Sequence, residues 1–268
     1  MLYTLISIAA AAFYLFAGIH LWLQLSKGEA PTGVNRRFLI LSTVAVAGHA
    51  VLLSNTVLTS SGWDLSFYHS ASLTTWLVAT ILIVTTCFKR VETLGVGIMP
   101  IAALTVIAEA IFGRNSIGQT TASPWIDLHI FLSIIAYSFL SIAAFQAVLL
   151  AIQERKLHNH HPGGIIRILP PLQSMENLLF QLITIGFLIQ SAALLSGLFF
   201  VEDIFAQHMA HKTVLSAFAW SIFGILLWGR WQYGWRGRTA IRWTLLGFGS
   251  LLLGYLGSKL VMDVVLQS

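Results

Sequence analysis

Two histidines lie within long apolar runs of this 268-residue chain, where ionisable side chains are uncommon. His49, in the segment GHAVLL, lies about eleven residues into the apolar run 38–59, and no charged residue is near it. In a helix this places His49 close to the middle of the run, at about 1.5 Å of rise per residue. Such an imidazole either forms hydrogen bonds to a neighbouring helix or acts as a ligand, because neutral imidazole is the commonest metal ligand in proteins.

His129 begins a polar stripe in the segment SPWIDLHIFLSIIAYSF. Ser133 and Tyr137 follow it at helical spacing, so all three share one face of a helix, and Gln146 lies close to the same stripe. A polar stripe of this kind is expected to face other helices rather than lipid. Hydrogen bonding between helices and coordination of a ligand are both compatible with His129.

A complementary face is predicted in the run 178–201, where Gly186, Gln190, Ala193 and Gly197 recur at helical spacing. Small residues let a second helix, or a flat planar ligand, approach the backbone closely. Helix packing alone is sufficient to explain the pattern, and a planar ligand is the alternative.

The remaining polar residues near the apolar runs give weaker indications of a ligand-binding or catalytic role. His69, His208 and His211 lie at the ends of runs and are expected to be solvated, and Glu109 lies within reach of Arg114. No phosphate-binding loop, dinucleotide fingerprint, zinc-protease motif or nucleophile elbow is present. We therefore predict no catalytic residues, and no metal site other than one that the transmembrane histidines could provide.

The composition requires a membrane as the surrounding medium. Hydrophobic residues make up 57% of the chain and charged residues 9%, whereas a soluble domain has about 25% charged residues. A run of about 20 apolar residues spans a bilayer as a helix. We predict an all-α, polytopic transmembrane bundle of about eight helices that forms one integral-membrane domain over 1–268. The expected spans are 2–25, 38–59, 70–88, 92–112, 125–152, 178–201, 213–229 and 243–266.

Basic residues alternate between successive connections and predict the orientation. Connections after the odd-numbered spans hold twelve lysines and arginines, whereas those after the even-numbered spans hold only Arg114 and Lys212. The positive-inside rule then places both termini outside, which is the periplasmic side if the membrane is a bacterial inner membrane. The cluster RWQYGWRGRTAIRW is expected to anchor the chain at the cytoplasmic interface. Basic residues at the membrane boundary rather than on one exposed face argue against a nucleic-acid partner.

Several of these segments resemble those of a known family. LITIGFLIQSAALLSGLFF and HKTVLSAFAWSIFGILLWGRWQYGWRGR resemble the cytochrome c assembly (CcsA/CcmC-type) membrane proteins, and are most similar to their divergent YpjD/HemX-like branch. GHAVLL is similar to the family's early transmembrane histidine segment, and LHIFLSIIAYSF to its outer histidine segment. The resemblance implies haem as a cofactor, His49 and His129 at haem-ligand positions, and other cytochrome maturation or membrane proteins as partners.

The chain also departs from the family pattern. The family's tryptophan-rich loop, which ends in Asp-Pro-Lys-Glu, is replaced by VEDIFAQHMAHK, and Trp228 stands at the position of the second transmembrane histidine. The second outer histidine is absent near the C-terminus. We therefore expect a haem-binding or haem-handling protein that lacks the haem-presenting loop.

The expected haem site is an outer one at His129. His211 would be its second ligand, or His69 in its place, and His49 would have a separate inner role. Two other functions stay open: a transporter or transporter accessory subunit, and a structural assembly partner that holds no ligand.

Overall fold

The computed structural model describes residues 2–27, 35–59, 62–64, 66–113, 124–158, 169–200 and 210–254. Within them the prediction of an all-α polytopic bundle is confirmed. The helices are α1 (Leu2–Ser26), α2 (Arg36–Thr56), α3 (Phe67–Phe88), α4 (Gly95–Phe112), α5 (Pro124–His158), α6 (Leu172–Phe200), α7 (Ala210–Tyr233) and α8 (Gly237–Leu252). A short 3₁₀ helix, η1 (Glu92–Leu94), precedes α4, and the strands β1 (Leu58–Thr59) and β2 (Gly62–Trp63) form a two-stranded sheet.

Seven of these helices, α1 to α7, are long and apolar enough to cross a membrane. They correspond to the first seven predicted spans. The eighth predicted span, 243–266, coincides with α8 as far as Leu252, and its residues beyond 254 lie outside the described part of the chain.

The chain divides into two compact units, each with a core of its own. Unit 1 comprises Met1–Ser60, Asp64–Gly118 and Ile152–Ser174, and unit 2 comprises Ser61–Trp63, Gln119–Ala151 and Met175–Ser268. Unit 1 therefore contains α1 to α4, and unit 2 contains most of α5 and α6 together with α7 and α8. The single domain expected over 1–268 stays a prediction.

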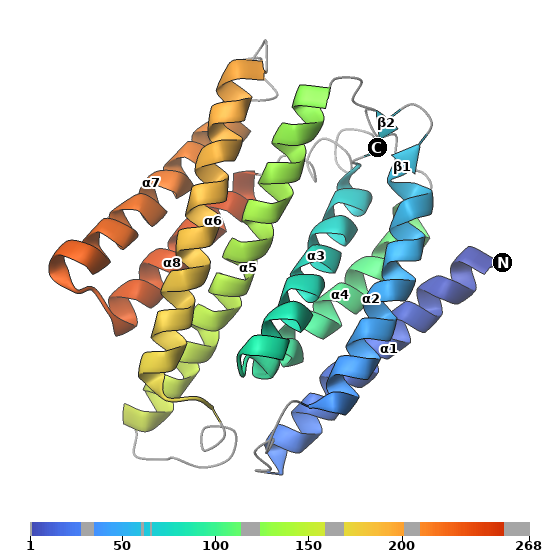
Figure 1. The fold of residues 1–268 in the computed structure, drawn as a ribbon, viewed down its shortest axis with the longest axis horizontal. Coiled ribbons are helices and arrows are strands. Elements are labelled where there is room, and N and C mark those ends of the chain that lie inside the picture. Colours follow the sequence, from blue (N-terminus) through green and yellow to red (C-terminus); the bar gives the residue numbers. More distant parts are fainter. Residues whose placement is uncertain are drawn as a thin grey trace. The chain divides into compact units, whose positions relative to one another are not determined.

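In unit 1, α1 packs against both α2 and α4, and α3 also contacts both of these helices (Figure 1). The close approach of α1 to α4 depends on Gly18, since a Cβ atom there would lie 3.2 Å from Cδ of Pro100. Tyr14 is fully buried in this core, which matters for the site below because its hydroxyl needs a partner.

In unit 2, α7 and α8 form an antiparallel pair joined by a tight turn (Figure 1). Gly234 takes a φ of 66° at the end of α7, a conformation that favours glycine. The amide of Gly234 donates to the carbonyl of Arg230 at 3.1 Å, which is the bond of an αL cap, and the amide of Trp235 donates to the carbonyl of Gly229 at 3.2 Å. The indole of Trp235 lies directly over Gly229, where any Cβ would collide with it.

The arginine and tryptophan cluster of the sequence is thus partly a folded turn. Arg230 Nη1 donates a hydrogen bond to the carbonyl of Trp235 at 3.1 Å, and the amide of Gly237 donates to Oε1 of Glu176 at 2.7 Å. Trp231 is 82% exposed, as a membrane-interface residue would be. The role of the cluster as an anchor at the cytoplasmic interface stays a prediction.

Candidate functional site

The site in unit 1 is built around His49, whose side chain is completely buried. Helix α2 places the ring between α1 and α3. The hydroxyl of Tyr14 lies 3.2 Å from Nδ1, and the hydroxyl of Ser72 lies 2.8 Å from Nε2. A neutral imidazole offers one N–H donor and one acceptor nitrogen, so one hydroxyl donates to the ring and the other accepts from it.

This arrangement leaves His49 without a free ring nitrogen. An iron ligand must present an unshared electron pair to the metal, and both in-plane positions of this ring are occupied by hydroxyls. Coordination would require Tyr14 or Ser72 to move away. The indole of Trp76 also fixes α3 against α2 nearby, since its Nε1 donates to the carbonyl of Val46 at 3.0 Å. Of the two interpretations that the sequence leaves open, the geometry favours a hydrogen-bonding role for His49.

The site in unit 2 is built around His129, which lies near the start of α5 and is half-buried. Its Nδ1 lies 2.8 Å from the carbonyl oxygen of Ala193 and 3.1 Å from the hydroxyl of Ser196, both on α6. Because a carbonyl can only accept, Nδ1 carries the proton and Nε2 holds the unshared electron pair. Among the described residues, Nε2 has no hydrogen-bond partner. Metal-bound histidines are typically held in this way, through an N–H donated to a carbonyl.

The ring of His129 packs against the backbone of α6 at Gly197. A Cβ atom at position 197 would lie 3.0 Å from Cε1 and 3.3 Å from Nδ1, so a side chain there would press on the imidazole. About three turns earlier on α6, a Cβ at Gly186 would lie 2.7 Å from Cγ of Leu140 on α5. At both glycines the small-residue face of α6 is covered by α5, so helix packing rather than a planar ligand occupies it there.

The polar stripe on α5 largely faces other helices, as the sequence predicts. Tyr137 donates its hydroxyl to the carbonyl of Leu251 on α8 at 2.8 Å, and Gln146 Nε2 donates to the carbonyl of Met175 on α6 at 3.0 Å. Ser133 is the exception, because its hydroxyl donates to the carbonyl of His129 in its own helix. Gln190, on α6, reaches α7 instead, where its Nε2 donates to the carbonyl of Ser216 at 3.1 Å.

Two further positions, the predicted second ligand His211 and the departure from the family pattern at Trp228, are less informative. His211 falls in the first turn of α7, and its side chain lies outside the described part of the chain. Its pairing with His129 stays a prediction. Trp228, at the position of the family's second transmembrane histidine, is 53% exposed and packs edge-on against Tyr233 at 5.4 Å between ring centroids.

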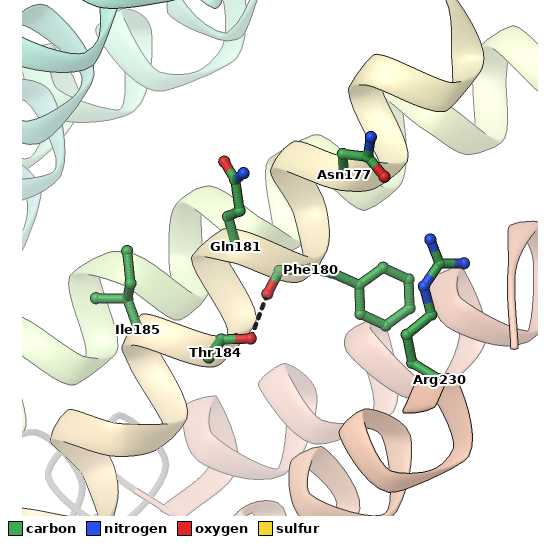
Figure 2. Close-up of a pocket in the computed structure, with 6 residues that line it drawn as sticks. All are labelled: Asn177, Phe180, Gln181, Thr184, Ile185 and Arg230. Atoms are coloured by element: carbon green, nitrogen blue, oxygen red, sulfur yellow. Dashed lines mark hydrogen bonds between the residues drawn. The ribbon is translucent and has the colours of Figure 1, made fainter. Parts of the chain in front are cut away.

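A separate open groove of about 460 Å³ lies between α6 and α7, at the end of unit 2 that carries the tight turn. Figure 2 shows the guanidinium of Arg230 beside the ring of Phe180, and its carbon lies 4.6 Å from the ring centroid. Asn177, Gln181, Thr184 and Ile185 complete the lining. None of these residues is a histidine, a cysteine or a methionine, so the groove offers haem iron no side chain of the kinds that usually coordinate it.

The structure also corrects one expectation from the sequence. His69 is not solvated: it is 6% exposed and lies between the carboxylates of Asp64 and Glu109 in unit 1. With a carboxylate facing each ring nitrogen, His69 is poorly suited to be the second ligand beside His129. No group of three or more histidine, cysteine, aspartate or glutamate side chains able to hold a metal ion occurs among the described residues.

The hydrogen-bond partners of His49 and His129 were not predicted from the sequence. Tyr14 is a polar side chain in the middle of an apolar run, at a depth similar to that of His49, and this signal could have linked the two. Ser72 and Ser196 gave no such signal, because a serine in a membrane helix usually donates to its own backbone.

Comparisons with known proteins place the chain among membrane proteins of cytochrome biogenesis. The family described as "Cytochrome C assembly protein" matches residues 37–266. The inner membrane protein YpjD of Escherichia coli K12 is 32% identical over 239 residues, which cover 87% of this chain and 89% of YpjD. A 28.8 kDa protein of Azospirillum brasilense is 35% identical over 144 residues, 53% of each chain.

A more distant similarity extends to a protein named for its biogenesis role. The cytochrome c biogenesis protein CcsA of Chlamydomonas reinhardtii is 25% identical over 141 residues, which cover 52% of this chain and 39% of CcsA. No solved structure matches the chain.

Proposed function

Because the chain belongs to the cytochrome c assembly protein family, we propose that it binds or handles haem in the bacterial inner membrane. The family resemblance marks two histidine positions, and they differ in whether a ring nitrogen is available. The observation that supports the proposal most directly is the state of His129, whose Nδ1–H is held by the carbonyl of Ala193 while Nε2 keeps its electron pair. With this tautomer, His129 would be able to hold an iron through Nε2.

The residues of this chain would supply binding and orientation, while haem when bound would supply a redox-active iron. His129 would hold the iron through Nε2, Ala193 and Ser196 would fix the ring orientation, and the absence of a side chain at Gly197 would leave room for the ring. His211 is proposed as the second ligand. His49, saturated by two hydroxyls, is assigned to the packing of α1, α2 and α3.

The proposed function stops short of haem attachment. The segment 201–212, VEDIFAQHMAHK, has no tryptophan, so it lacks the surface with which the family presents haem. We therefore expect that the protein does not replace a full cytochrome c synthase. Expression in a cell that lacks that enzyme tests this, and restored covalent haem on cytochrome c would contradict it.

The orientation with both termini outside is also proposed, on the asymmetry of lysine and arginine between connections. Single cysteines at Ser116 and at Gly163, in a Cys87→Ser background because Cys87 is exposed, would test it. A membrane-impermeant thiol reagent added from outside should label the first and not the second. The reverse pattern would overturn the orientation.

The decisive experiment for haem is an absorption spectrum. Protein purified after expression with haem supplied should show a Soret band that stays with the protein through size-exclusion chromatography in detergent. Wild-type protein without this band would leave a ligand-free assembly partner or a transporter component as the function. His129 would then be an interhelical hydrogen-bonding residue.

A further inference from the structure

A second group of ionisable side chains lies in unit 1, where α2 ends and α3 begins. His69, in the first turn of α3, is the central member. Its Nδ1 lies 3.4 Å from Oδ2 of Asp64, and its Nε2 lies 3.9 Å from Oε1 of Glu109 on α4. The imidazole therefore lies between two carboxylates, and each ring nitrogen faces one of them.

Access to water decreases along this row. The side chain of Asp64 is 20% exposed, that of His69 is 8% exposed and that of Glu109 is 1% exposed. Asp64 is held at the surface end, because its Oδ1 accepts the amide of Ser66 at 3.1 Å and its own amide donates to the carbonyl of Val57 at 2.9 Å. The row thus runs from a carboxylate that water reaches to one that water does not.

The buried end of the row lacks hydrogen-bond partners. Oε1 of Glu109 accepts a hydrogen bond from the hydroxyl of Thr56 on α2 at 2.7 Å, but Oε2 of Glu109 and Nδ1 of His69 are buried and have no hydrogen-bond partner among the described residues. In the part of the chain that the structure describes, neither carboxylate forms an ion pair with a lysine or arginine. An ionised carboxylate buried without a compensating charge costs several kcal/mol, and among the described side chains around it only a protonated His69 could supply that charge.

A proton suits this row better than a metal ion. The two nitrogens of an imidazole point in opposite directions, so one metal ion cannot bind the ring and both carboxylates together. Among the described residues, Asp64 and Glu109 are the titratable groups that face His69, and α2 contributes the hydroxyl of Thr56, which donates to Glu109. One proton placed on either His69 or Glu109 would compensate or remove the buried negative charge. Ionisable residues within membrane segments commonly mark proton relays.

We propose that Asp64, His69 and Glu109 form a proton relay that loads and unloads a buried proton-binding site at Glu109. A proton from water binds to Asp64, and Oδ2 passes it to Nδ1 of His69. The resulting imidazolium releases the proton on Nε2 to a carboxylate oxygen of Glu109, so one proton enters and one carboxylate becomes a carboxylic acid. The ring is left neutral with its proton on Nδ1, and the reverse transfer restores the first tautomer. Neither contact is a hydrogen bond in the structure, so a small side-chain movement or one water must close both the 3.4 Å gap between Oδ2 and Nδ1 and the 3.9 Å gap between Nε2 and Glu109.

The relay does not depend on haem binding, and infrared spectroscopy tests it directly. Protein in lipid should show the carbonyl stretch of a protonated carboxylic acid that appears as the pH is lowered. The band should be absent in Glu109→Gln and unchanged in Glu92→Gln, a matched control because Glu92 is also buried in unit 1. A titrating band that survives in Glu109→Gln would overturn the proposal.

Kinetics separate a relay from direct access of water to Glu109. After a rapid drop in pH, His69→Gln should slow the growth of the band by about a hundredfold, the lower end of what a positioned proton-transfer group contributes. The final amplitude should be retained. An unchanged rate in His69→Gln would show that protons reach Glu109 without the imidazole.

A second variant keeps the test decisive if Glu109→Gln does not fold. Thr56→Val preserves the carboxyl group and removes its one hydrogen bond. The carbonyl stretch should therefore shift to higher frequency. A band that does not move in Thr56→Val would assign the titrating group to another carboxyl and overturn the proposal.

Discussion

His49 and His129 are imidazoles in apolar helices, but their ring nitrogens meet different neighbours. In unit 1, hydroxyls on two other helices occupy both nitrogens of His49, and the side chain is fully buried. In unit 2, a backbone carbonyl occupies one nitrogen of His129, and the other has no partner among the described residues. The first histidine is suited to hold helices together and the second to hold a ligand. Burial of a histidine therefore says less about its function than the chemistry of its two partners.

The largest expected difference between the two histidines is in haem binding. His129→Ala should abolish the Soret band, because removal of the ligand should weaken binding by more than the roughly hundredfold that loss of an outer partner costs. His49→Ala should retain the band. Absorption spectra of the two variants, prepared in parallel with haem supplied, check this. Loss of the band in His49→Ala, in a variant that still elutes as folded protein, would remove the distinction.

The next difference is in the free energy of unfolding. Here the substitution of His49 should have the larger effect and that of His129 the smaller. His49→Ala should lower the free energy of unfolding by about 2–4 kcal/mol, because it leaves a cavity and two buried hydroxyls without their partner. His129→Ala should cost about 1 kcal/mol, since its ring is half-buried and makes its hydrogen bonds to a single helix. Unfolding in mixed detergent micelles, followed by circular dichroism, measures both. Equal losses would show that His129 is as structural as His49.

A smaller effect is expected when the ring of His129 is displaced but not removed. Gly197→Ala places a Cβ about 3.0 Å from Cε1 of the imidazole, so the ring must move by a few tenths of an ångström. Haem affinity should fall by about tenfold, as for a disturbed outer partner. Gly249→Ala is the matched control, because a Cβ there meets nothing within 4 Å. Haem titrations that give the same affinity for both variants would rule out this role of Gly197.

The smallest effect concerns the hydroxyls around His49. Tyr14→Phe and Ser72→Ala should each lower the free energy of unfolding by about 1 kcal/mol, because each removes one hydrogen bond while the packing is largely kept. Each loss should nearly vanish in a His49→Ala background, since the shared partner is then already gone. The measurement is a double-mutant cycle in the same unfolding assay. Additive losses would show that the hydroxyls act independently of the imidazole.

The lengths of the helices show that apolar runs in the sequence do not predict where a helix ends. The run 125–152 was predicted as a span, whereas α5 continues to His158. Charged residues end the apolar stretch but not the helix, because Arg155 and Lys156 in the last turn interact favourably with the helix dipole. Hydrophobicity therefore locates the membrane-spanning part, and the helix ends follow from capping and local electrostatics.

The wrong prediction that His69 is solvated has a different cause. A residue at the end of an apolar run is close to water and equally close to the ends of neighbouring helices, so its position along the chain does not decide its burial. Asp64 and Glu109, which flank His69, are 45 residues apart in the chain. Their meeting depends on how α3 and α4 pack, and no periodicity in the sequence encodes it.

The sequence by itself determined that the chain lies in lipid, that its apolar runs form helices, and which polar residues lie within those runs. Long apolar runs allow only helices in lipid, because every backbone polar group must be satisfied within the segment, and a histidine within such a run needs a partner. Only the tertiary structure decided which partner each histidine has. Hydrogen bonds act over about 3 Å, so the helix that lies beside a ring decides whether a given nitrogen is occupied. The difference between His49 and His129 arises at that level.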